Sequence, residues 1–279
     1  MWLQLADLIN EFPELILGVV ILHDIDNSQN RAEITELLRQ AEAALSGKFG
    51  GTPVIEHPYI AAWREAYRKF GAKPKDYPSS VENLTRRVLN GANIGHINNL
   101  VSLYNTISLR HILPVGGEDL DKITGDVLLT RAGNDESAVF LLGEKEARAP
   151  HEGEILYKDE VGAICRRWNW KEADRTKLTQ KTKNAFLVIE ALPPVSRNTV
   201  ETAIHELAEL VEQYCGGVVS TAFLDKDNRK SNPHFKCNSI FSLSSKRVCN
   251  DSAPTKARTG TLGILFLITG FRKLKKRSV

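Results

Sequence analysis

The sequence has few cysteines and no long apolar run, and both absences exclude classes of protein. None of its four cysteines forms a C-x-x-C pair or has a histidine at zinc-ligand spacing. This disfavours a metal site, and the sparse usage fits a reducing compartment. No apolar run approaches the ~18 residues of a membrane span, and no basic region precedes an apolar segment near Met1. The sequence therefore predicts a cytoplasmic protein outside the membrane.

Motifs that mark common active sites are absent as well. The chain has no phosphate-binding loop, no dinucleotide fingerprint and no G-x-S-x-G elbow, and no cofactor is expected. Its seven histidines are scattered singly, so no catalytic triad follows from spacing. With 42% hydrophobic and 25% charged residues, the composition is that of an ordinary globular protein.

Most of the chain has no excess of positive charge. Residues 1–228 contain 25 basic and 33 acidic side chains, a net charge of −8, whereas residues 229–279 contain 12 basic and one acidic side chain. Because non-specific affinity for nucleic acid comes from Lys and Arg at phosphates, the acidic body cannot be a general polyanion binder. Any contact with nucleic acid must use a local patch.

The basic segment 229–279 has two interpretations. Its apolar run 260–271, followed by the basic run 272–277, suggests an interfacial membrane anchor. The alternative is a disordered extension, which the weak periodicity and the absence of membrane adaptation in the body favour.

The body combines helical and strand patterns. Apolar spacing predicts helices over 1–12, 31–45, 57–70, 81–90, 98–109 and 198–214, with Gly47 ending the second. Short β-type runs predict strands at 15–22, 127–130, 138–142, 155–157, 162–165, 185–189 and 218–224. Such closely spaced strands indicate an α+β fold, in which helices flank a mixed or antiparallel sheet. We expect residues 1–54 to pack on a main domain, 55–228, that precedes the tail.

Four further segments stand out: AKPKDYPSSVENL (72–84), INNLVSLYN (97–105), LPVGGEDLDKI (113–123) and CRRWNW (165–170). Together they resemble the B3/B4 domain of the phenylalanyl-tRNA synthetase β subunit, a family that also has free-standing members. Their order and spacing make the resemblance fairly specific, and it covers roughly residues 55–228.

The resemblance implies a site that edits aminoacyl-tRNA. The family's Asn-Asn start falls on Asn98 and Asn99, and its Thr-Asn pair of the editing pocket falls on Tyr104 and Asn105. The family has a histidine two residues after a proline, which here is Pro114, and that position holds Gly116. An editing-site glutamate of the family falls near Asp174, with insertions in between.

Hydrolysis without that histidine remains chemically possible, because an aminoacyl ester is already activated. A site need only hold the carbonyl, donate to the developing oxyanion and position a water. We expect Asn105, Asp174 and Glu118 to carry the chemistry. The expected binding residues are Tyr104, Gly116, Gly117, Asp119, Arg166, Arg167, Trp168 and Asn169.

Each of these residues also has a structural interpretation. Gly116 and Gly117 suggest a turn, one of the two arginines could be solvated, and Trp168 could belong to the core. Three functions follow from the resemblance: hydrolysis of a mischarged aminoacyl-tRNA in trans, RNA or tRNA binding without catalysis, and a pocket for an amino acid or related metabolite. The acidic body argues most strongly against the second.

Overall fold

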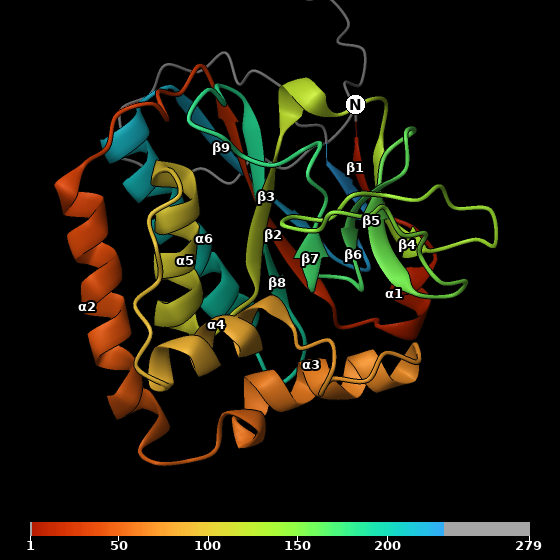
Figure 1. The fold of residues 1–279 in the computed structure, drawn as a ribbon, viewed down its shortest axis with the longest axis horizontal. Helices are drawn as coiled ribbons and strands as arrows, with labels where there is room; N and C mark the ends of the chain where they lie inside the picture. Colours follow the sequence, from red (N-terminus) through yellow and green to blue (C-terminus); the bar gives the residue numbers. More distant parts are fainter. Residues whose placement is uncertain (1, 232–279) are drawn as a thin grey trace, which may run out of the picture. The chain divides into compact units, whose positions relative to one another are not determined.

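Two β-sheets and six α-helices make up residues 2–231, the part of the chain that the computed structural model describes (Figure 1). This content confirms the predicted α+β class. The helices are α1 (Leu8–Glu11), α2 (Ala32–Phe49), α3 (Pro58–Lys69), α4 (Ser80–Leu89), α5 (Asn99–His111) and α6 (Arg197–Cys215), with short 3-10 turns at Val54–Glu56 and Leu120–Lys122. The strands are β1 (Leu3–Leu5), β2 (Ile16–His23), β3 (Val115–Asp119), β4 (Val127–Arg131), β5 (Ile155–Lys158), β6 (Ala163–Arg166), β7 (Lys171–Glu172), β8 (Ala185–Ala191), β9 (Val218–Leu224) and β10 (Lys230–Ser231).

One sheet is mixed and the other is antiparallel. The six-stranded sheet has the order β10-β1-β4-β5-β6-β7, and its β1 and β4 run parallel. The four-stranded sheet has the order β3-β8-β2-β9, with every neighbouring pair antiparallel. Figure 1 shows α2, α5 and α6 on one side of the four-stranded sheet and the six-stranded sheet on the other.

The first 54 residues supply an interior strand of the four-stranded sheet. Strand β2 pairs with β8 along seven residues on one side and with β9 along seven on the other. An interior strand uses the backbone groups on both of its edges, so this segment shares its hydrogen bonds with residues more than 160 positions away.

Strand β8 separates two apolar cores. Phe186 and Val188 pack into a cluster with residues of the six-stranded sheet and α3, whereas Leu187 and Ile189 pack with α5 and α6. Successive side chains of a strand point to opposite faces, so one strand can serve both layers. The continuous apolar run of β8 is explained by burial on both faces.

Two predicted helices have different bounds. The spacing over 1–12 predicted one helix, but residues 3–5 form β1, because Leu3 and Leu5 alternate into the core and pair with β4. The helix predicted to stop at Gly47 continues to Phe49, whose buried ring joins the core. Gly50 then ends it with a φ of 52°, a left-handed conformation that glycine adopts without strain.

Two predictions in the second half of the body are wrong. Residues 138–142 form no strand and contribute only isolated bridges at Val139 and Leu141. The turn predicted at Gly116–Asp119 is strand β3, which pairs with β8 at the edge of the sheet. Glycine weakens a strand pattern, but Gly117 is needed there: a Cβ would lie 2.7 Å from the Phe186 carbonyl oxygen.

The amino-acid composition changes at residue 229, but backbone pairing with the rest of the protein continues to Ser231. Lys230 and Ser231 form β10, which pairs with β1, and the Arg229 carbonyl accepts from Leu5 N–H at 2.7 Å. The rest of the predicted tail, 232–279, lies outside the described residues. Within the described range, no helix is long and apolar enough to cross a bilayer.

The close packing of β2 against α6 gives a test of the fold. A Cβ on Gly18 would lie 2.1 Å from Ile204 Cδ1, so Gly18→Val should destabilise the protein by about 2 kcal/mol through overpacking. Gly47→Ala is the matched control, because Gly47 lies on the exposed face of α2 with no atom within 4 Å. It should stabilise by about 0.8 kcal/mol. Urea unfolding measures both, and a neutral Gly18→Val would contradict the packing described.

Candidate functional site

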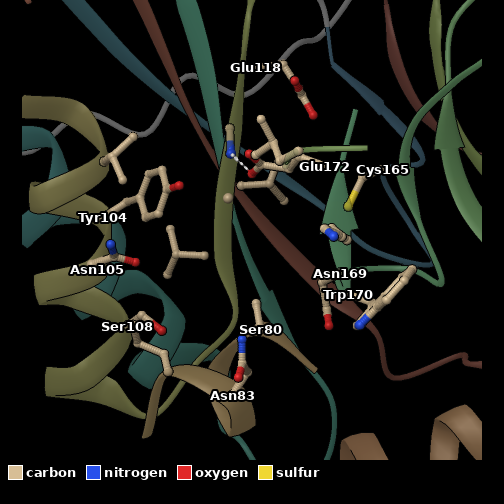
Figure 2. Close-up of a pocket in the computed structure, with 18 of the residues that line it drawn as sticks. Ser80, Asn83, Tyr104, Asn105, Ser108, Glu118, Cys165, Asn169, Trp170 and Glu172 are labelled. Atoms are coloured by element: carbon tan, nitrogen blue, oxygen red, sulfur yellow. Dashed lines mark hydrogen bonds between the residues drawn. The ribbon is translucent and has the colours of Figure 1, made fainter. Parts of the chain in front are cut away.

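A cavity of about 450 Å³ lies between the two sheets, a size typical of small-molecule sites (Figure 2). Strands β3 and β8 line it from the four-stranded sheet, and β5, β6 and β7 line it from the six-stranded sheet. Helices α4 and α5 complete the wall. Segments from five separate parts of the chain therefore converge on one space.

The two ends of the cavity differ in exposure and in charge. Its most exposed lining residues are Asn83 and Arg87 of α4 and Ile97, which is 65% exposed; we call these three residues the mouth. Figure 2 shows Glu118 and Glu172 at the end opposite Ser80 and Asn83, and we call this pair the acidic end. Glu118 is only 4% exposed and Glu172 is half-buried, so the acidic end is less exposed than the mouth.

Helix α5 presents three polar side chains to the cavity, of which Ser108 already donates to the Leu113 carbonyl at 2.7 Å. The position of the helix is fixed by Asn98, whose Oδ1 accepts from Val101 N–H at 3.0 Å and whose Nδ2 donates to the Leu178 carbonyl at 3.1 Å. Tyr104 and Asn105 line the cavity, and neither side chain makes a hydrogen bond within residues 2–231. The hydroxyl and the amide are thus available to a ligand.

Alternation along β3 decides which of its residues reach the cavity. A Cβ on Gly116 would lie 3.1 Å from Glu172 Oε1, so this position faces the acidic end, as does Glu118 two residues later. Gly117 contributes its backbone, donating N–H to Glu172 Oε1 at 3.5 Å. The side chain of Asp119, next to Glu118 in the strand, points elsewhere.

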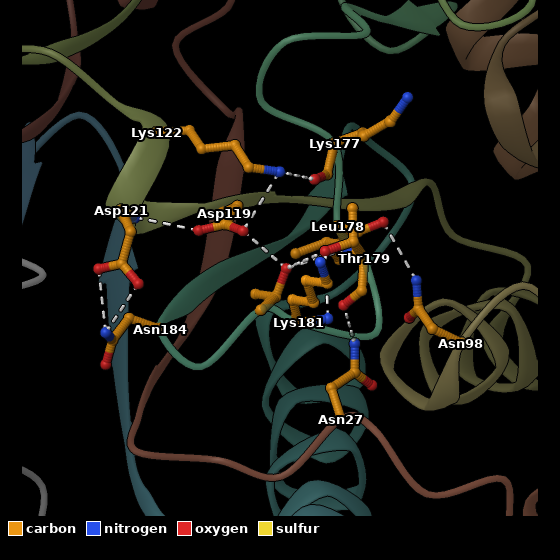
Figure 3. Close-up of polar contacts among 11 residues, drawn as sticks. Asn27, Asn98, Asp119, Asp121, Lys122, Lys177, Leu178, Thr179, Lys181 and Asn184 are labelled. Atoms are coloured by element: carbon orange, nitrogen blue, oxygen red, sulfur yellow. Dashed lines mark hydrogen bonds and ion pairs between the residues drawn. The ribbon is translucent and has the colours of Figure 1, made fainter.

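Asp119 belongs to a separate polar cluster, shown in Figure 3. Its Oδ2 accepts from Thr182 Oγ1 at 2.7 Å and lies 3.4 Å from Lys122 Nζ. Asn27 and Asn98 bind the same loop, donating to the carbonyls of Thr179 and Leu178. Asp119 therefore holds the 177–184 loop, and the expectation that it binds substrate is not met by its position.

Glu118, which is buried, and Glu172, which is half-buried, form a carboxyl pair at the acidic end. Burial, and then the neighbouring Glu172, raise the pKa of Glu118 well above its ordinary range. Burial also raises the pKa of Glu172 to about 7, although the Gly117 N–H opposes the shift. Like charges so close cannot both ionise easily, so the pair holds a proton at neutral pH.

A third glutamate, the buried Glu190 of β8, lies in a hydrogen-bonded network that lines the cavity. Its Oε1 accepts from Tyr157 Oη at 2.6 Å, and its Oε2 accepts from Asn169 Nδ2. Asn169 Oδ1 in turn accepts from Tyr67 Oη at 2.8 Å. Burial raises the pKa of Glu190 to about 7 against these hydrogen bonds. Asn169 thus lines the cavity with its amide already engaged.

The cavity contains one cysteine, Cys165, and its thiol is not activated. Burial, followed by the charges of Glu172 and Glu118, raises the pKa of Cys165 well above its ordinary value. A thiol is a poor nucleophile compared with a thiolate, so covalent catalysis by Cys165 is disfavoured. Within the described residues, no group of His, Cys, Asp and Glu has a geometry that could hold a metal ion.

The arginines expected beside the site are structural. Arg166 binds Glu154 with two hydrogen bonds of 2.8 Å, and both side chains are buried. Arg167 lies over the Tyr77 ring at 3.7 Å and contacts Glu154 at 3.9 Å. Neither lines the cavity, so the expectation that they bind substrate there is not met by their positions.

Trp168 contributes to the wall from within the core. It is fully buried and makes edge-to-face contacts with Phe12 and Trp63 at centroid distances of 4.9 and 5.0 Å. These surroundings support the interpretation that Trp168 belongs to the core.

The resemblance placed an editing-site carboxylate near Asp174, two residues from Glu172, the carboxylate that lines the cavity. Asp174 is half exposed and pairs with Lys177 outside the cavity. Glu172, in β7, faces the cavity instead. A lone glutamate in a two-residue strand has no sequence signal of its own, which is why it was missed. The only available hint was the position of the family's glutamate.

Comparisons with known proteins agree with the motifs. The model of a family described as the B3/4 domain matches residues 62–216. A similar solved structure is an N-terminal fragment of the phenylalanyl-tRNA synthetase β subunit from Pyrococcus horikoshii, with 11% identity and a TM-score of 0.42. The match covers 78% of this chain and 49% of that one, so the chain spans about half the length of the fragment. No curated protein matches the chain.

The pKa of Glu172 predicts how its replacement changes stability. The ordinary carboxyl value is 4.5 and the folded value about 7, so the folded protein binds this proton more tightly and loses stability as the pH rises between them. Glu172→Gln removes that loss, and should stabilise the protein at pH 8 by on the order of 2 kcal/mol and little at pH 4.5.

Glu154→Gln is the matched control with the opposite sign. Burial would raise the pKa of Glu154, but hydrogen bonds from Arg166 and from His151 N–H hold it below its ordinary value. Its replacement breaks a buried pair and should cost about 3 kcal/mol at pH 8. Thermal unfolding at several pH values measures both variants. A Glu172→Gln protein less stable than the parent at pH 8 would refute the assignment of Glu172 as an uncompensated carboxyl.

Proposed function

The chain belongs to the B3/4 domain family, and we propose that it acts on tRNA, hydrolysing the ester of a mischarged aminoacyl-tRNA in trans. One feature of the cavity carries the proposal: the unused hydrogen-bonding groups of Tyr104 and Asn105 face a space that also contains the carboxyls of Glu118 and Glu172. An aminoacyl ester needs both kinds of group, donors for its carbonyl oxygen and acceptors for its ammonium or for water.

The proposed reaction is a direct attack by water. The ester carbonyl lies against α5, where Asn105 Nδ2 and Tyr104 Oη donate to the oxyanion as the water oxygen bonds to the carbonyl carbon. The bond between the carbonyl carbon and the ribose oxygen then breaks. A proton from the water passes to that oxygen, which leaves as the ribose hydroxyl. Burial, and then Glu172 and Glu118, raise the pKa of Tyr104, so its hydroxyl remains a donor. No covalent intermediate is required, which suits a site whose cysteine is a thiol.

The mouth suits the 3′ end of a tRNA better than the body's net charge suggests. Arg87 lines the mouth and makes no ion pair within the described residues. Exposed Lys73 and Lys75 lie in the loop that leads into α4. Tyr77 of that loop packs edge-to-face on Trp170, which lines the cavity, at 5.0 Å. We propose that these cations supply the local positive charge that binding to a polyanion needs.

The chemical proposal is tested by substitution in a deacylation assay over a panel of aminoacyl-tRNAs. Asn105→Ala should lower kcat/KM for the preferred substrate at least about tenfold, because it removes an oxyanion donor. Asp174→Ala should retain activity, because Asp174 lies outside the cavity. A parent protein that hydrolyses no ester of the panel would exclude the deacylase and leave a binding module or a metabolite pocket.

The tRNA contact is tested by salt dependence. Lys75→Ala/Arg87→Ala should reduce the slope of log(kcat/KM) against log[salt] by about 1.4, the value for two phosphate contacts on a single strand. Lys226→Ala/Arg229→Ala removes the same charge beyond the end of β9, the edge strand opposite β3, and should leave the slope unchanged. Equal slopes for the two double variants would place the tRNA contact elsewhere.

A further inference from the structure

The acidic end has more acceptors than donors: burial and then Glu172 raise the pKa of Glu118, and only Thr176 and the charge of Arg175 oppose them. Glu118 Oε2 is buried and accepts no hydrogen bond. Glu172 accepts only from Gly117 N–H, at 3.5 Å, beyond the usual range of an N–H···O bond. Within residues 2–231, neither carboxyl forms an ion pair with a lysine, arginine or histidine. An unpartnered buried acceptor costs about 1–3 kcal/mol, so the arrangement needs a reason.

Buried carboxylates that lie away from the cavity are paired with a cation, whereas Glu190, which lines it, has only hydrogen bonds from Tyr157 and Asn169. Glu82 contacts Arg64 and Arg86 at 2.6 and 2.7 Å, and Asp159 binds Arg175 at 2.5 Å. Glu154 has Arg166 at 2.8 Å. The protein therefore supplies a guanidinium where a carboxylate is buried away from the cavity. At the acidic end, the space that a guanidinium would fill is part of the cavity itself.

We infer that the acidic end binds the ammonium group of a ligand side chain, so that the substrate is the tRNA ester of an amino acid with a cationic side chain such as lysine. Three N–H donors of one ammonium satisfy the free acceptors of Glu118 and Glu172, and its charge compensates them on ionisation. The inference rests on the proposed function for the remainder of the ligand.

The position of the acidic end favours the side chain over the α-ammonium group. The tRNA reaches the cavity through the mouth, at Asn83 and Arg87, and Glu118 and Glu172 lie at the opposite end (Figure 2). The α-ammonium is attached to the carbon next to the ester carbonyl, so it stays near the groups of α5 that hold that carbonyl. The side chain extends further, towards the carboxyls of the acidic end.

Two amides that differ by one amino group test the inference on the whole chain. Lysinamide and norleucinamide share the α-ammonium and the four-carbon side chain, and only lysinamide carries the terminal ammonium. Isothermal titration should show lysinamide binding at least tenfold more tightly, about 1.4 kcal/mol. Equal affinities, tighter binding of norleucinamide, or no binding of either amide would overturn the inference.

Isosteric variants assign the preference to the carboxyls. Glu118→Gln and Glu172→Gln should each lose most of the preference for lysinamide, whereas Glu201→Gln, an exposed glutamate on α6 that pairs with Arg197, should keep it. A preference that survives in both cavity variants would refute the role of the pair. The comparison of the two amides on the parent protein decides the inference even if one variant does not fold.

Deacylation separates this inference from the proposed function. One tRNA charged in turn with lysine and with norleucine presents the same nucleic acid with either side chain. Faster hydrolysis of the lysyl ester supports both proposals. Hydrolysis of the norleucyl ester alone keeps the deacylase and overturns the cationic substrate. Selective binding of lysinamide without hydrolysis of either ester keeps the cation site and overturns the deacylase.

Discussion

The register between β8 and its two neighbours is the constraint on which the site depends. Pairing with β3 and β2 sends Phe186, Val188 and Glu190 towards the six-stranded sheet, and sends Leu187 and Ile189 towards α5 and α6. A slip of one residue would exchange the two faces, placing Glu190 among the helices and an isoleucine in the cavity wall. Apolar packing on both faces of β8 therefore fixes the positions of the polar side chains as well.

The cavity is held open at the expense of stability. Glu118 is buried and Glu172 is half-buried, and within residues 2–231 neither pairs with a cation, while Glu154 and Asp159 each have an arginine. Replacing an uncompensated carboxyl by its amide would stabilise the fold, so the carboxyl is explained by something other than folding. Raised pKa values are typical of functional sites for the same reason, because a ligand supplies the charge that the protein withholds.

Sequence patterns predicted the elements with strong periodicity and missed those whose residues are unusual for their position. Strand β2 and helix α5 follow from apolar spacing, because tertiary packing uses the same faces that the pattern shows. Strand β3 was read as a turn because two adjacent glycines weaken a strand pattern, although Gly117 is required by the close approach of β8. The resemblance pointed to Tyr104, Asn105, Gly116 and Glu118, which all line one cavity. It could not show that Arg166 has its partner in Glu154, since no local pattern records a contact twelve residues away.

The glycine at position 116 connects the sequence difference to the geometry. The resembling synthetase pattern has a histidine at this position, but here a Cβ alone would already lie 3.1 Å from Glu172 Oε1. A larger side chain pointing the same way would displace that carboxyl, so an imidazole at 116 and the present position of Glu172 exclude each other. The loss of the histidine therefore changes this part of the cavity rather than emptying it: the space next to β3 contains a carboxyl with a pKa of about 7. An imidazole can donate or accept a proton, and in its charged form it repels cations. A carboxyl in the same space attracts cations, so the departure from the family's pattern changes the charge that this part of the cavity presents to a ligand.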